Sequence, residues 1–250
     1  MRERVLRTSL VKVRPDDVFF LAMAAVAVLA VLVGFARSYF LAGMLFAPLP
    51  SLLVHIHAAA FLSWIVLFVA QISLVTAQRV DLHQRLGAFG LALAALMIVL
   101  GVLTATARVA RQLAHPGEDT MADILDLYAD PIFDMLMFAG FISAAFVNRT
   151  RPPVHKRLIL FATFSLLDAG FDRWSIFDPY PLWQVNLFCF VPLVVATLTY
   201  DKLSTGKIQS VTLWSSAFLL ATQESRHFLS ETAVWASFTH WAAAQVPPLS

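Results

Sequence analysis

Long apolar stretches recur along the chain, separated by short polar segments. Each is close to the roughly 20 residues that a helix needs to cross a hydrocarbon core. Lipid offers no partner for backbone polar groups, and the alternation of a barrel strand is absent, so each stretch is predicted to be a helix. The seven predicted spans are Val18–Ala36, Ser51–Thr76, Arg85–Ala107, Leu125–Val147, Val154–Arg173, Trp183–Tyr200 and Ser210–His227.

The segments outside these spans are short, which predicts one all-α membrane domain with no linker. We expect a basic leader over residues 1–17, a single seven-helix bundle over 18–228 and an amphipathic tail over 229–250. In the tail, Trp235, Phe238 and Trp241 recur at helical spacing. A helix with such a face is predicted to lie along the membrane interface rather than to cross it.

Composition strengthens the membrane prediction. The 250 residues are 59% hydrophobic and only 14% charged, whereas soluble domains carry about 25% charged residues. The first span follows an Arg-rich leader but is longer than the apolar region of a signal peptide, so it is expected to be an anchor helix. The single cysteine, Cys189, excludes an internal disulfide and a cysteine-based zinc site.

The charges divide unevenly between the two predicted sides of the membrane. One side holds the leader and most of the 18 Lys and Arg residues, whereas the other holds most of the 16 acidic residues. Basic loops normally remain in the cytoplasm. We therefore expect a bacterial inner-membrane protein with its amino end in the cytoplasm and its carboxyl end outside.

Ionisable side chains concentrate in the outer halves of several predicted spans. Intramembrane charges are costly and usually face the bundle interior, where they often mark function. Asp130 and Asp134 lie on one face of the fourth span because residues i and i+4 stack. The candidate ligands are His55, His57, Asp130, Asp134, Asp168, Glu224 and His227, with Arg37, Tyr39 and Arg173 as charge partners. His55 and His57 differ by about 200° around a helix at 100° per residue, so only one can face such a site; the deeper His57 is preferred.

Three interpretations of these groups remain open. The polar side chains can simply fasten helices together, as in a non-catalytic assembly or scaffold subunit. Imidazole and carboxylate can instead bind a transition metal, with His57, Asp134, Asp168 and His227 as ligands from four helices. The same pocket can also hold a small polar or lipid-like ligand. A pocket of this kind, open to the outer side, is the preferred active hypothesis.

The alternative is a b-type haem or quinone redox protein that uses His83 and His155. These residues lie in "DLHQRLG" and "PVHKRLI", and the H-x-R-L pattern repeats at the start of two outward-running helices. Two axial ligands must share one depth, which these positions do. Each histidine also adjoins basic residues at a membrane edge, where such residues extend toward lipid phosphate.

The segments "GFARSYFLAG", "PLPSLLVHIHAAAF", "VDLHQRLG" and "VHKRLI" together resemble an uncharacterised family of bacterial multi-pass membrane proteins with H-x-H and repeated H-x-R-L motifs. The resemblance covers roughly residues 18–175 and implies a bundle of about seven helices. It implies no activity. No nucleotide-binding fingerprint or G-x-S-x-G elbow is present, and nucleic-acid binding lacks a soluble basic face, so the expected partners are the bilayer and a small ligand.

Overall fold

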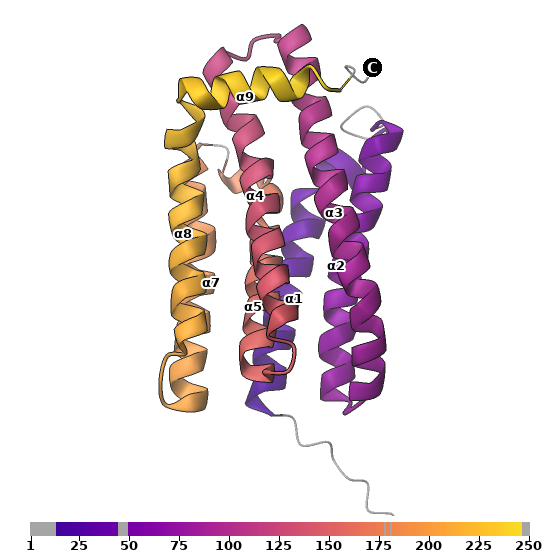
Figure 1. Ribbon diagram of the computed structural model, residues 1–250, viewed down its shortest axis with the longest axis vertical. Coiled ribbons are helices and arrows are strands. Elements are labelled where there is room, and N and C mark those ends of the chain that lie inside the picture. Colours follow the sequence, from indigo (N-terminus) through magenta and orange to yellow (C-terminus); the bar gives the residue numbers. More distant parts are fainter. Residues whose placement is uncertain (1–13, 45–49, 178, 181, 247–250) are drawn as a thin grey trace, which may run out of the picture.

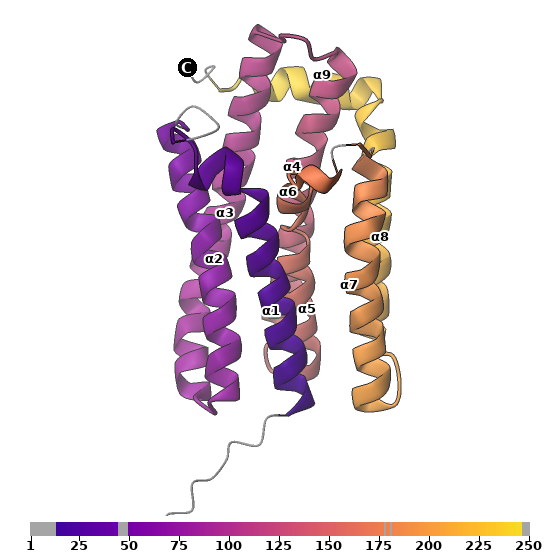
Figure 2. The same ribbon diagram turned by 180° about the vertical axis from the view of Figure 1, so that it is seen from behind.

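The protein is a bundle of α-helices that run along one common direction (Figures 1 and 2). The computed structural model describes residues 14–44, 50–177, 179–180 and 182–246. Within these residues the elements are α1 (Pro15–Gly34), η1 (Ala36–Phe40), α2 (Leu52–Thr76), α3 (Val80–Ala114), α4 (Met121–Val147), α5 (Pro152–Phe164), α6 (Asp168–Phe171), η2 (Ser175–Phe177), α7 (Leu182–Thr205), α8 (Ser210–Ser230) and α9 (Ala233–Ala243). Here η1 is a π-helix and η2 a 3₁₀-helix.

Five of the described helices are long and apolar enough to cross a membrane: α1, α2, α3, α4 and most of α7. Large apolar side chains on the bundle surface agree with lipid contact, for example Leu136, which is 60% exposed, and Trp214, which is 71% exposed. The predicted all-α bundle is thus confirmed, and its long apolar helices are compatible with an integral membrane protein. The predicted count of seven spans is not confirmed, because α5 has only 13 residues and α8, with 21 residues, is too polar.

The predicted fifth span is broken into α5 and α6. The chain leaves the α-helix at Ser165, whose hydroxyl donates to the carbonyl of Ala162 at 2.9 Å, and α6 begins at Asp168. Beyond this break α6 packs very closely on α1: a Cβ atom on Gly34 would overlap the backbone of Gly170. Small residues permit such close helix contacts in membranes, and this contact fixes where Asp168 lies.

The predicted third span is longer than expected. At about 1.5 Å per residue, the 35 residues of α3 exceed a hydrocarbon core of about 30 Å. Its last turns and the start of α4 support α9, which lies across this end of the bundle (Figure 1). Val109, Ile124 and Tyr128 form a small second core with α9, and the Trp235 indole donates to the Leu125 carbonyl at 3.1 Å. We call this end the α9 end; α1 begins at the opposite end.

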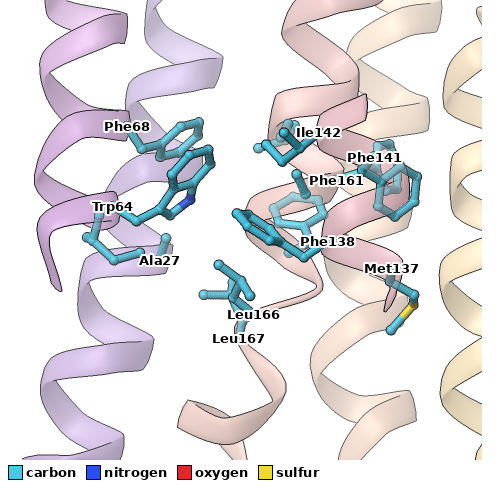
Figure 3. Packing of buried hydrophobic residues seen from close by; sticks show 14 of the residues in the cluster. Ala27, Trp64, Phe68, Met137, Phe138, Phe141, Ile142, Phe161, Leu166 and Leu167 are labelled. Carbon is cyan, nitrogen blue, oxygen red and sulfur yellow. The ribbon is translucent and has the colours of Figure 1, made fainter. Parts of the chain in front are cut away.

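The main core lies midway along the bundle, where aromatic rings from α2, α4 and α5 meet (Figure 3). Trp64 and Phe138 pack edge to face with ring centres 5.0 Å apart, and Phe161 is fully buried between α4 and its neighbours. The Trp64 indole donates to Thr163 Oγ1 at 3.3 Å. This apolar middle separates the polar groups at the α9 end from those at the opposite end.

Candidate functional site

A buried arginine gathers carboxylates from two elements near the α9 end. Arg226 of α8 lies 2.9 Å from Asp130, 3.4 Å from Asp134 and 2.8 Å from Asp168. Arg226 is 3% exposed, and Asp168 is 1% exposed. Two of the aspartates share one face of α4 as their i, i+4 spacing predicts, whereas the third is the first residue of α6. We call these four residues the Arg226 cluster.

Two amide side chains complete the contacts of the cluster. With its amide oriented to suit both neighbours, Asn186 of α7 donates to Asp168 at 2.8 Å and accepts from Arg226 at 3.2 Å. Gln223, one turn before Arg226, donates to Asp134 at 3.5 Å. The cluster therefore joins α4, α6, α7 and α8. Sequence reasoning assigned no role to Asn186 or Arg226; the signal available for Arg226 was a charge near the end of a predicted span.

The cluster is rich in negative charge. Three carboxylates contact one guanidinium, and Asp172 places an oxygen within 4.8 Å of oxygens from Asp130 and Asp168. Arg108 of α3 and Arg173 interact electrostatically with these acids. A buried charge is tolerated only when it is paired and hydrogen-bonded. Arg226 is the cation that three of these carboxylates contact, and its ion pairs join α8 to α4 and α6.

A separate cavity of about 410 Å³ lies beside the cluster, bounded by α1, η1, α2, α3, α4 and the α5–α6 segment. Its walls are mostly apolar, with Phe61 and Met135 among them. Arg108, Arg111 and Arg173 also line it, and among the described residues Asp134 is the single acidic one that does so. This volume falls within the range of about 300–1,000 Å³ that is usual for small-molecule sites. We call it the arginine-lined cavity.

The two histidines of α2 have different surroundings. His57 lines the arginine-lined cavity and stacks on Phe61 with ring centres 4.2 Å apart. His55 is exposed, and its Nδ1 lies 3.0 Å from the Tyr39 hydroxyl. His57 is thus the inward ring. Its buried Nδ1 has no hydrogen-bond partner in the described part of the chain, and the same holds for the Thr104 hydroxyl.

The four predicted metal ligands are not brought together. Asp134 and Asp168 turn to Arg226, whereas His57 faces the cavity. His227 follows Arg226 directly and is about 100° further around α8, so it points outward, where its ring lies 3.0 Å from Asp126 and 3.5 Å from Glu231. Glu224 is partly exposed on α8. Of the predicted charge partners, Arg37 and Tyr39 belong to η1, and the guanidinium of Arg173 lies 4.8 Å from the centre of the Phe35 ring.

The alternative pair, His83 and His155, does meet at the opposite end. The ring centres lie 6.4 Å apart and the planes are at 88°. Both rings line a pocket of about 120 Å³ between α2, α3, α4 and α5, which we call the histidine pocket. Organic ligands usually occupy about 300 Å³ or more, so a porphyrin or quinone does not fit this pocket as it stands.

A second buried ion pair at this end also escaped sequence reasoning. Arg157 and Asp201 form a salt bridge, and they are 2% and 0% exposed. Asp201 additionally accepts from the Thr212 hydroxyl at 2.5 Å and from the backbone NH of Gln209 at 3.0 Å. These contacts join α5, α7 and α8, which makes the pair a counterpart of the Arg226 cluster at the other end.

The chain matches no protein-family model, no curated protein and no solved structure.

Proposed function

We propose that the protein is an inner-membrane protein that binds a small amphiphile, with an apolar body and an anionic group, in the arginine-lined cavity. Binding alone is assigned to this cavity, without a reaction. One observation carries it: a cavity of about 410 Å³ near the α9 end has apolar walls and three arginine side chains.

The cavity walls indicate the chemistry of the ligand. Three arginines against one aspartate favour a negative group, and arginine binds phosphates and carboxylates through paired hydrogen bonds. The apolar walls suit a hydrocarbon chain or ring. His57 Nδ1 and the Thr104 hydroxyl, both buried and unpartnered within the described residues, would gain a hydrogen-bond partner from the polar group of such a ligand.

The proposed topology puts this cavity toward the outside. In this topology, seven segments span the membrane: the five apolar helices, α8, and the broken α5–α6 segment. The basic segments near Arg14, Arg85, Lys156 and Lys202 lie at the end opposite α9, which the positive-inside tendency assigns to the cytoplasm. The α9 end then faces outward, and a ligand would come from the outer leaflet or from the space outside it.

Binding of a simple probe tests the proposal. Dodecyl phosphate carries both features of the ligand, and dodecanol lacks the charge. Native mass spectrometry of the protein in a non-ionic detergent would count bound probe molecules and give dissociation constants. We expect one bound dodecyl phosphate and much weaker binding of dodecanol. A charge-assisted hydrogen bond contributes about 1.5–3 kcal/mol, so changing either Arg108 or Arg173 alone to Gln should weaken phosphate binding about 10- to 100-fold.

Matched controls separate the cavity from the rest of the surface. Ala58 lines the cavity, whereas its neighbour Ala59 is exposed on the outside of α2. Ala58→Phe should abolish probe binding, and Ala59→Phe should leave it unchanged. Arg149→Gln, an exposed charge at the opposite end, serves as the control for charge. Equal binding by the Ala58 and Ala59 variants would refute the proposal and leave a purely structural bundle.

A further inference from the structure

We propose that His83, His155 and Gln71 bind one transition-metal ion of the copper–zinc class in the histidine pocket, independently of the arginine-lined cavity. The spacing of the two rings is the first observation. Two imidazoles on one ion, with metal–nitrogen bonds of about 2.0–2.1 Å each, place their ring centres about 5 Å apart at a tetrahedral angle and about 6.5 Å apart in a linear arrangement. The observed separation is 6.4 Å.

One of the rings is already oriented as a ligand. His155 Nδ1 lies 2.9 Å from the carbonyl oxygen of Ala145. A carbonyl only accepts, so Nδ1 carries the proton and Nε2 keeps a free lone pair. Metal-binding histidines almost always have their second nitrogen fixed in this way.

The pocket also contains unsatisfied acceptors. His83 Nδ1 and Gln71 Oε1 are buried atoms without a hydrogen-bond partner among the residues described. The Gln71 side chain is held in place because its Nε2 donates to the His83 carbonyl at 3.2 Å. Buried polar atoms rarely remain unpartnered, and each such atom needs an explanation. An ion bound by two imidazoles and one amide oxygen accounts for both atoms.

The pocket's size and chemistry select the kind of ion. About 120 Å³ holds an ion and a few waters but no porphyrin. Imidazole nitrogen suits copper, zinc, iron and nickel. The three donors are neutral and the other walls are apolar, such as Trp64 and Ile142. Because the cost of burying an ion rises with its charge, monovalent copper fits better than a divalent ion.

Metal retention by the purified protein tests the inference. The protein in detergent would be incubated with copper kept reduced by ascorbate, or with zinc, then passed through a desalting column and analysed for metal. We expect one equivalent of copper or zinc in the unaltered chain and less than a tenth of that in His83→Phe and His155→Phe. These substitutions keep an aromatic ring at each position. His240→Phe, which changes an exposed residue of α9, should retain the full equivalent.

A second variant keeps both rings and so distinguishes metal binding from folding. Gln71→Glu supplies a carboxylate in place of the amide oxygen, so it should bind the ion more tightly, by at least tenfold, and metal should raise its melting temperature more than that of the unaltered protein. No retained metal in either protein would overturn the inference and reduce the pair to an edge-to-face ring contact. An intense haem absorbance that depends on His83 would also overturn it, in favour of a porphyrin.

Discussion

Replacing Arg226 by glutamine would remove the guanidinium that contacts three buried carboxylates and leave a shorter, neutral amide. Asp130, Asp134 and Asp168 would then face one another with no cation in contact. Losing one partner of a buried ion pair lowers the free energy of unfolding by about 3–5 kcal/mol, because the remaining charge stays buried. Arg226 is 3% exposed and Asp168 is 1% exposed, so both charges are shielded from bulk water.

The size of the decrease in the free energy of unfolding identifies its cause. Hydrogen bonds between helices in membranes average only about 0.6 kcal/mol. A loss above 3 kcal/mol therefore reports unpaired charge rather than missing hydrogen bonds. Asp168→Asn should cost less than Arg226→Gln, because it leaves the arginine with two carboxylates. The double variant should cost less than the sum of the two single losses, since both changes remove the same contact.

The assay is reversible unfolding by sodium dodecyl sulfate in mixed micelles, followed by circular dichroism. Arg149→Gln, an exposed charge at the opposite end, provides the reference. A loss for Arg226→Gln within about 0.5 kcal/mol of that reference, the range of ordinary surface changes, would refute the buried-charge reasoning. The Arg226 cluster would then contribute no net stability.

Five further substitutions, two of them matched controls, test other parts of the fold in the same assay. Gly34→Ala places a Cβ atom against the backbone of α6 and should destabilise the protein by about 1–3 kcal/mol. Its control is Gly140→Ala, whose Cβ atom meets nothing within 4 Å and which should stabilise the protein by about 0.5–1 kcal/mol. Asp201→Asn leaves a buried arginine without its ion-pair partner and should lower the free energy of unfolding by about 3–5 kcal/mol. Asp81→Asn, the same change at an exposed residue, should lower it by at most about 1 kcal/mol. His227→Ala should change stability by less than about 1 kcal/mol, because the ring is exposed and pairs only at the surface.

The apolar pattern predicted much of the fold because lipid forces each long apolar stretch into a helix. It located α1, α2 and α4 to within a few residues of their observed bounds. It missed the break after α5, since Ser165 leaves the helix through a local hydrogen bond and the contact of α6 with α1 stabilises the turn. It also ended α3 too early, because the last turns of α3 are held by α9 rather than by lipid.

The candidate site was less predictable. Helical spacing showed that Asp130 and Asp134 share a face, but not which helix that face meets. Arg226 and Asn186 come from α8 and α7, and only the packing brings them to the aspartates. Spacing also showed that His55 and His57 point apart. Ring separation between His83 and His155 depends on how two hairpins dock, which a repeated motif does not specify.

The position of α9 has a consequence for how the protein is made. Ribosomes produce α3 and α4 long before α9, yet Val109, Ile124 and Tyr128 are covered only when α9 docks on them. Until then these side chains lack the cover that α9 provides. A chain that stops at Ser230 would keep them uncovered permanently, and quality-control proteases recognise such surfaces. Chains that lack α9 should therefore be degraded in cells faster than chains that keep it.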